Sequence, residues 1–174
     1  MSKIFCLIGK SASGKDTLYR RILSEQRENL VPVVPCTTRP RRVNERNGID
    51  YDFMTEEQLH QLEKEDQIIE KRQYTTTKGV WSYFTRKFTL EDGKNYLLIT
   101  TPDGVRHLME YYGPSVLCVV YLVVDDRIRL ARCMERESLQ SLPDYAEVRR
   151  RFLADQEDFS EQMIEKLPGL HRIH

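Results

Sequence analysis

Residues 9–17, GKSASGKDT, have the types and spacing of a loop that binds phosphate. In the pattern G-x-x-x-x-G-K-[ST], backbone N–H groups wrap an anion at a helix N-terminus, and the lysine reaches the outer phosphates. A hydroxyl normally follows the lysine and ligates magnesium. Here that position holds Asp16, and Thr17 comes next. Because a carboxylate repels bound phosphates unless a cation lies between them, Asp16 and Thr17 are candidate magnesium ligands.

A second group of candidate residues lies in the segment 37–53, TTRPRRVNERNGIDYDF. Arg39, Arg41 and Arg42 fall within four positions on a stretch that contains a proline. Forked guanidinium donors at this density suit a phosphate group, which accepts several hydrogen bonds. Taken alone, the segment is also explained as a solvated basic loop.

A third group consists of arginines near the C-terminus. Arg132 and Arg136 lie one helical turn apart on one face, and Arg151 follows in the stretch EVRRRFL. Ion pairs with neighbouring glutamates on helix surfaces are the simpler explanation for these three residues.

The elements that must position these groups begin with three apolar runs, at 4–8 (IFCLI), 96–100 (YLLIT) and 116–124 (VLCVVYLVV). Each is bounded by turn residues and followed by a helical pattern, which favours a parallel sheet covered by helices on both faces. After the first run and its glycine-rich loop, Leu18, Ile22 and Leu23 recur at helical spacing within 16–28. Strand, loop and helix in this order are the context in which such a loop binds phosphate.

Further helices are predicted over 55–66, over 126–140 and from about 144 into the 150s. Thr55 with Gln58 three residues later has the form of a capping box, and Asp144 is the expected cap of the last helix. The segment 30–53 lacks helical periodicity, so we expect short strands and loops there.

The composition limits the class of protein. A chain of 174 residues fits one domain, and 27 basic against 27 acidic residues leave no net charge that would indicate nucleic-acid or membrane binding. The four cysteines lack zinc-site and disulfide patterns, so we expect reduced thiols and a cytoplasmic location. No apolar stretch has the length of a secretion signal or a membrane span. The composition does not indicate an oligomeric state.

The segment 37–53 resembles the region of the guanylate kinase family that binds the nucleoside monophosphate (NMP). That region reads T-T-R-x-x-R-x-x-E-x-x-G-x-D-Y-x-F, and the chain matches it without a gap at Thr37, Thr38, Arg39, Arg42, Glu45, Gly48, Asp50, Tyr51 and Phe53. The resemblance implies an α/β fold: a three-layer P-loop kinase core with a mostly parallel sheet, a small NMP-binding region and a helical lid. It places the core at 1–34, 91–125 and 151–174, the NMP-binding region at about 35–90 and the lid at about 126–150.

The resemblance also implies an activity, the transfer of the γ-phosphoryl group of ATP to GMP with Mg²⁺ as cofactor and nucleotides as the only partners. Lys15 would then stabilise the moving phosphoryl group, while Arg132, Arg136 and Arg151 would close over it from the lid. The residues implied in ATP binding are Gly9, Ser11, Ala12, Ser13, Gly14, Lys15, Asp16 and Thr17. Those implied in acceptor binding are Arg39, Arg42, Tyr51, Glu70, Tyr83 and Thr101.

Three positions depart from the family pattern. Where the family has L-D-I-D-x-Q-G, with one aspartate helping to hold magnesium and the other reading the base, this chain has Ile99 and Thr101. Pro35 replaces the family's guanine-contacting serine. We therefore expect weaker discrimination between bases, by about 1–3 kcal/mol per lost hydrogen bond. We also expect Asp16 to supply the carboxylate that position 99 lacks.

Two alternative functions stay open at this point. One is a kinase of the same fold that phosphorylates another phosphorylated acceptor, which the substitutions at Pro35 and Thr101 favour. The other is a catalytically silent guanylate kinase-like module that binds protein ligands. The intact pair Gly14 and Lys15 argues against the silent module.

Overall fold

The computed structural model describes residues 2–25, 29–42, 45–76 and 79–174. The strands in these residues are β1 (Ile4–Ile8), β2 (Leu30–Pro32), β3 (Cys36–Thr37), β4 (Asp52–Phe53), β5 (Ile68–Thr76), β6 (Gly79–Arg86), β7 (Asn95–Ile99), β8 (Leu117–Leu122) and β9 (Leu170–Ile173). The helices are α1 (Lys15–Ser24), α2 (Glu56–Lys64), α3 (Pro102–Tyr112), α4 (Asp126–Ser138), α5 (Tyr145–Asp158) and α6 (Glu161–Ile164), with a 3₁₀ turn η1 at Pro114–Val116.

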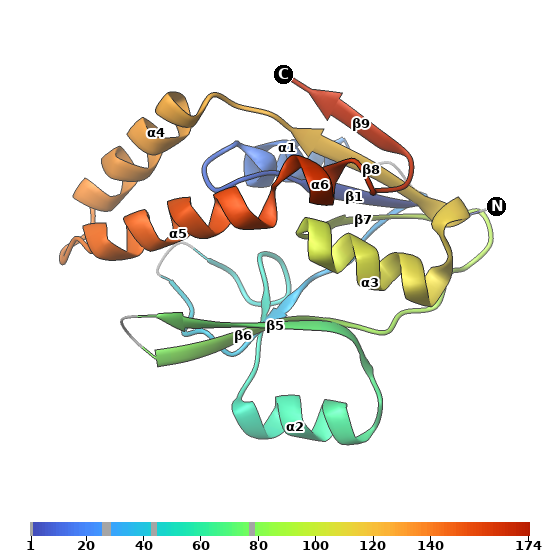
Figure 1. Ribbon diagram of the computed structural model, residues 1–174. Helices are drawn as coiled ribbons and strands as arrows, with labels where there is room; N and C mark the ends of the chain where they lie inside the picture. Colours follow the sequence, from blue (N-terminus) through green and yellow to red (C-terminus); the bar gives the residue numbers. More distant parts are fainter. Residues whose placement is uncertain (1, 26–28, 43–44, 77–78) are drawn as a thin grey trace.

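The main sheet has five strands in the order β2-β7-β1-β8-β9 (Figure 1). Every pairing in it is parallel, as the three continuous apolar runs predict. β1 lies between β7 and β8, so the loop that follows β1 emerges at the carboxyl edge of the sheet's centre. In open parallel sheets this edge is where ligands bind.

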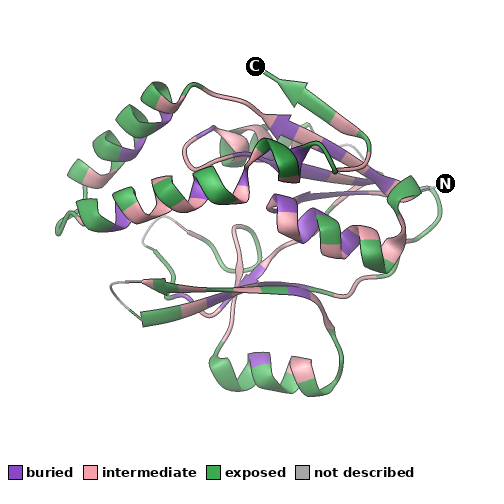
Figure 2. Ribbon diagram, in the orientation of Figure 1, coloured by how far each residue is buried: buried purple, intermediate pink, exposed green. Residues whose placement is uncertain are grey.

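Alternating residues of β1 pack on opposite faces of the main sheet. Ile4, Cys6 and Ile8 belong to one buried cluster, which includes residues of α3 and α6. Leu7 belongs to a second cluster with Tyr19 of α1. Helices therefore cover both faces, and the buried colouring in Figure 2 is concentrated on these central strands. The predicted three-layer α/β core is confirmed.

A second sheet lies below the main body in Figure 1, in the order β4-β3-β6-β5. Its largest part is the antiparallel pair β5–β6, and α2 packs against it through Leu59. The predicted capping box at the start of α2 is confirmed, because Thr55 accepts from Gln58 N and the Gln58 side chain accepts from Thr55 N. The long β5–β6 hairpin was not predicted from the sequence.

α4 and α5 form an arm that extends beyond the main sheet (Figure 1). Asp144 caps α5 by accepting from Glu147 N, as predicted. α4 ends at Ser138 and α1 at Ser24, both before the predicted ends. The last predicted residues of α1, 26–28, lie outside the described residues. In the described ranges no helix combines the length and apolar character needed to cross a membrane.

Candidate active site

The glycine-rich loop turns directly into α1, with Lys15 as the first helical residue. Gly14 has a φ of 93°, a left-handed conformation that favours glycine because it has no Cβ. Gly9 is required for a different reason: a Cβ there would lie 2.5 Å from Ser13 Oγ and 3.3 Å from the Leu122 carbonyl oxygen. The loop therefore presents its amides at a helix N-terminus, where an anion is stabilised.

Hydrogen bonds connect this loop to α4 and α5. Both carboxylate oxygens of Asp155 accept from Ser11, at 2.8 Å from its backbone N and 3.2 Å from its Oγ. Arg129 is fully buried and donates to the Ser11 carbonyl oxygen at 3.0 Å and to Asp155 at 3.2 Å. Arg132 donates to the Ala12 carbonyl oxygen at 3.2 Å. The loop conformation thus depends on residues of α4 and α5, of which only Arg132 was a predicted site residue.

The candidate magnesium ligands are the most open residues of the loop. The Asp16 side chain is 67% exposed, and its Oδ2 lies 3.9 Å from Lys15 Nζ. Thr17 is also exposed. Within the described ranges there is no group of three or more His, Cys, Asp or Glu residues that could hold a metal ion. A single carboxylate fits Mg²⁺ when nucleotide phosphates and water supply the other ligands, which is its usual binding mode in kinases.

Arg39 is buried, and its guanidinium group is engaged by neighbours from the same region. It forms a forked pair with Glu45, at 2.9 and 2.8 Å, and its Nε donates to the Tyr83 hydroxyl at 3.1 Å. The rings of Tyr51 and Phe53 lie 5.4 and 5.6 Å from its Cζ, close enough for cation–π attraction. Arg39 therefore organises the acceptor region as well as carrying positive charge.

Arg42 is exposed, and its guanidinium group lies near two other positive charges. Its pKa is lowered, because the protein displaces water around it and because Arg151 and Arg39 repel its charge. Arg151 belongs to α5, so the two segments bring guanidinium groups together. Like charges held close favour an anion between them.

The tyrosines link the acceptor region to the phosphate loop. The rings of Tyr51 and Tyr74 both pack edge-on against Tyr83, with centroids 5.9 and 5.7 Å away. Burial, the Tyr83 hydroxyl and the charge of Asp16 raise the pKa of Tyr51 to about 12. Arg20 of α1 also forms an ion pair with Asp50, next to Tyr51. The loop and the acceptor region therefore face each other.

One cleft of about 180 Å³ lies between the loop, the hairpin and α5. Its lining includes three groups of residues: Ser11 and Lys15 from the loop, Tyr74 and Tyr83 from the hairpin, and Arg150, Arg151 and Asp158 from α5. Thr101, at the end of β7, also lines it. Lys15 of the phosphate loop and Tyr83 and Thr101 of the predicted acceptor site thus reach a common space, whereas Arg39, Arg42 and Tyr51 do not line it.

Glu70, the predicted base-reading carboxylate, is buried and fully engaged. Its Oε1 accepts from the Thr85 hydroxyl at 2.7 Å and from Arg72 Nη2 at 3.3 Å. Its Oε2 accepts from Arg72 Nε at 2.9 Å. Arg72 also donates from Nη1 to Thr101 Oγ1 at 2.9 Å. Glu70 and Thr101 were both predicted to bind the acceptor nucleotide. They are connected by Arg72, which was not a predicted site residue.

Of the remaining lid arginines, Arg151 lines the cleft and Arg136 does not. Arg151 donates to Glu147 at 2.8 Å, so the surface pairing considered for it is present. Arg136 and Arg151 also line a second, smaller hollow with Arg129. Arg150, which lines the main cleft and lies 5.8 Å from the ring centroid of Tyr74, was missed. In the sequence Arg150 is one of three consecutive arginines at 149–151. Which of them faces the cleft depends on their angular positions around the helix.

The comparisons with known proteins agree with this geometry. A family model described as guanylate kinase matches residues 1–164. The guanylate kinase of Wolbachia pipientis wMel is 33% identical over 161 residues, which cover 91% of this chain and 77% of that protein. The guanylate kinase of Thermotoga maritima is 30% identical, with 78% of this chain and 67% of that protein covered.

A solved structure supports the fold. The crystal structure of guanylate kinase from Anaplasma phagocytophilum superposes with a TM-score of 0.64 at 23% identity, covering 98% of this chain and 76% of that one. At this identity the likeness concerns the fold alone, whereas the family model extends over most of the sequence. The chain belongs to the guanylate kinase family.

Proposed function

We propose that this chain is an ATP-dependent NMP kinase that transfers the γ-phosphoryl group of ATP to GMP, giving ADP and GDP. The observation that carries the proposal is the common cleft: Lys15 lines it from the phosphate loop, and Tyr83, which accepts from Arg39, lines it from the acceptor region. Phosphoryl transfer requires mainly positioning and charge compensation, so both nucleotides must meet in one space. The relatives named guanylate kinases support GMP as acceptor.

In this proposal the chain's residues act as binding and charge-compensating groups. The loop amides and Lys15 hold the phosphates of ATP, while Arg42, Arg39 and Tyr51 hold the acceptor phosphate. Arg132, Arg136 and Arg151 supply positive charge from the lid, where negative charge spreads in the transition state. No general base is required. The core, NMP-binding and lid boundaries given above remain predictions about which parts move relative to one another.

Magnesium is part of the proposal, with Asp16 and Thr17 as the ligands from the chain. When bound, the ion would supply positive charge that neutralises the charge building up on the phosphate oxygens. The support is the position of Asp16, exposed and 3.9 Å from Lys15. Ile99 gives further support, because it packs against the apolar cluster of β1 and α1 and offers no ligand from β7.

Replacing Asp16 with serine is expected to raise the Mg²⁺ concentration for half-maximal activity about tenfold, the effect of losing about 1.4 kcal/mol of charge attraction. The measurement is a Mg²⁺ titration of ADP release at saturating ATP. Asp92→Ser, an exposed turn residue, is the matched control and should titrate as the unmodified protein does. An unchanged titration curve for Asp16→Ser would remove Asp16 from the metal site.

We also propose that the protein works in the cytoplasm. All four cysteines fall in the described residues as free thiols, and burial raises the pKa of Cys6 to about 12 and that of Cys36 to about 11. Buried, protonated thiols behave as small apolar side chains and do not require an oxidising compartment.

The function is tested by coupled ADP release with ATP and Mg²⁺ against GMP, dGMP, AMP, CMP and UMP. The proposal expects GMP to give the highest kcat/KM. A different best acceptor would favour the related kinase with another substrate, a possibility raised by the occupied carboxylate of Glu70. Absence of turnover with every acceptor would contradict the kinase and favour a protein-binding module.

A further inference from the structure

The carboxylate of Glu70 is buried, and both of its oxygens already accept hydrogen bonds. Glu70 is 3% exposed, and its hydrogen bonds with Arg72 and Thr85 engage both oxygens. A carboxylate oxygen already holding charge-assisted bonds in a desolvated site gains little from a further donor, since breaking one of them leaves a buried charge unpaired.

Neighbouring segments pack closely around Glu70, which is buried. A Cβ at Gly104, in the first turn of α3, would lie 3.7 Å from the carboxyl carbon of Glu70 and 2.1 Å from Thr100 Oγ1. The glycine is needed because of the close Thr100 hydroxyl, whereas the distance to Glu70 is that of an ordinary van der Waals contact. Glu70 is thus enclosed between Gly104, Thr85 and the guanidinium group of Arg72.

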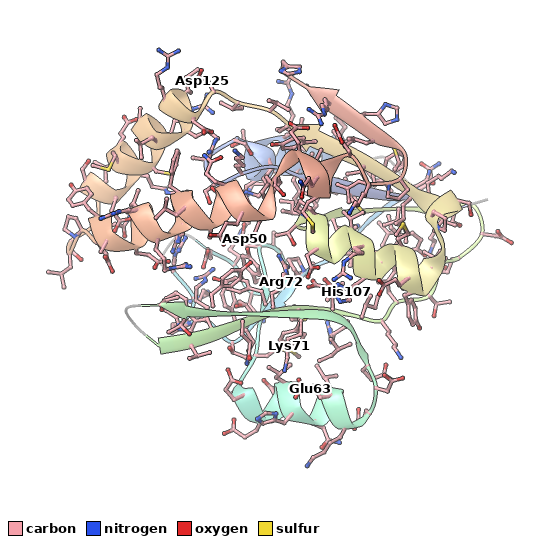
Figure 3. All side chains as sticks on the ribbon, in the orientation of Figure 1. Asp50, Glu63, Lys71, Arg72, His107 and Asp125 are labelled. Carbon is pink, nitrogen blue, oxygen red and sulfur yellow. The ribbon has the colours of Figure 1, made fainter. Side chains whose placement is uncertain are left out.

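Arg72 bridges Glu70 and Thr101, and Thr101 lines the cleft although Arg72 itself does not. Successive residues of β5 point to opposite faces: Lys71 forms an ion pair with Glu63 of α2, and Arg72 points toward the main body (Figure 3). The Arg72 side chain is 18% exposed, whereas that of Glu70 is 0% exposed. Its Nη1 donates to Thr101 Oγ1, and Thr101 lines the cleft.

The groups beside Arg72 keep it charged and leave an unused hydroxyl nearby. Burial lowers the pKa of Arg72, but the adjacent Glu70 carboxylate outweighs this effect and the pKa is raised. Thr100 lines the cleft, is 4% exposed, and its Oγ1 has no hydrogen-bond partner among the described residues. Thr100 and Thr101 therefore line this corner of the cleft, and the guanidinium group of Arg72 donates both to Thr101 and to the Glu70 carboxylate.

We propose that Arg72, and not Glu70, contacts the base of the acceptor, so that the enzyme recognises hydrogen-bond-accepting atoms such as the 6-oxo group of a purine and ignores the 2-amino group of guanine. This inference rests on the proposed function and specifies its substrate class: 6-oxopurine nucleoside monophosphates, with GMP and IMP as equivalent members. A guanidinium fork suits the adjacent O6 and N7 acceptors of such a base. The 2-amino group, a donor, would need a free acceptor such as an unpaired carboxylate.

The test compares GMP with IMP, which lacks only the 2-amino group. The proposal expects values of kcat/KM within about threefold of each other. If Glu70 read the 2-amino group, the lost bond to a charged acceptor would make IMP about 10- to 150-fold worse. A preference for GMP in that range would overturn the proposal while leaving the kinase assignment intact.

Arg72→Ala provides the sharper readout, because removing the arginine uncovers Glu70. The ratio of kcat/KM for GMP to that for IMP is expected to rise to about 10 or more. Lys71→Ala, the neighbouring cation that points to α2, is the matched control and should leave the ratio unchanged. A ratio that does not change in Arg72→Ala would contradict the inference.

Arg72→Lys covers the case in which Arg72→Ala does not fold, because lysine keeps a positive charge beside Glu70. Loss of the planar fork is expected to raise KM for both GMP and IMP about tenfold with kcat little changed. Wild-type KM values would show that the charge is needed only for the fold and would overturn the proposal. Calorimetric binding of GMP and IMP without ATP decides the question even if no acceptor is turned over: equal affinities support it, and a tenfold preference for GMP contradicts it.

Discussion

Replacing Lys15 with alanine is expected to lower kcat for ADP formation about 10²- to 10³-fold, the effect of removing one preorganised positive group from a phosphoryl-transfer site. Lys15 follows Gly14 at the start of α1. It lines the same cleft as Tyr83 of the acceptor region. The measurement is the coupled ADP-release assay at saturating ATP and GMP.

Lys10→Ala is the matched control, since Lys10 belongs to the same loop but does not line the cleft. Its Nζ donates to Gln156 Oε1 at 2.7 Å and lies 3.8 Å from Asp126. This variant should retain kcat within about threefold, because exposed pairs of this kind contribute little. Equal losses in the two variants would mean that the loop's fold, and not the charge of Lys15, supports the activity.

Alanine substitutions at Arg39 and Arg42 are expected to have different effects, the first on stability and the second on activity. Arg39→Ala leaves Glu45, whose side chain is 15% exposed, without its cation and with only the backbone N–H of Arg42 as a partner, and should lower the free energy of unfolding by about 3–5 kcal/mol. Arg42→Ala removes an exposed side chain, so the melting temperature should stay nearly constant. Its kcat/KM for GMP should fall about 10- to 150-fold, because a charged hydrogen bond to the acceptor phosphate is lost.

The Arg39 prediction includes a pH dependence. Burial raises the pKa of Glu45, but hydrogen bonds from Arg39 and from Arg42 N outweigh it, so the pKa is lowered in the folded protein. The pKa of Glu45 is lower in the folded protein than the value of about 4.3 in the unfolded chain, so ionised Glu45 stabilises the fold at any pH above about 4.3. This stabilisation is lost as the pH falls through the folded pKa. Arg39→Ala should therefore show a smaller loss of stability on acidification below about pH 4 than the unmodified protein.

Urea unfolding at several pH values and steady-state kinetics measure the two effects separately. Arg41→Ala is the control in the same loop, and its exposed side chain should be replaceable with little change in either quantity. Wild-type kcat/KM in Arg42→Ala would exclude Arg42 from the acceptor site. A fully stable Arg39→Ala would show that the Glu45 pair does not support the fold.

The main sheet and the helix starts were predictable because they depend on local patterns. A continuous apolar strand such as 4–8 is recognisable by itself, and Thr55 and Asp144 cap helices through residues three positions away. The glycine-rich loop was also recognisable, because phosphate binding requires glycines and a lysine at this spacing.

The hairpin and the electrostatic partners of the site were not predictable in this way. In β5 Tyr74 lies between the polar residues Gln73 and Thr75, but in β6 Tyr83 is followed by Phe84, so the two strands share no clear alternation; residues 77–78 lie outside the described residues. The pairing of Arg129 with Asp155 spans 26 positions, and that of Arg72 with Thr101 spans 29. Such contacts are set by the packing of distant segments. Glu70 and Arg72, two residues apart on one face of a strand, offered a local signal, as did Glu147 and Arg151, one helical turn apart.

The central claim is that the anion-binding loop at Lys15 and the guanidinium groups of Arg39 and Arg42 serve one cleft. The most direct measurement is calorimetric binding of a bisubstrate ligand in which adenosine and guanosine are joined through five phosphates. If the claim holds, this ligand should bind about 10²-fold or more tightly than ATP or GMP alone, because the second contact becomes intramolecular. An affinity no better than that of the tighter single nucleotide would contradict the claim, since the two sites would then not share one path for the phosphoryl group.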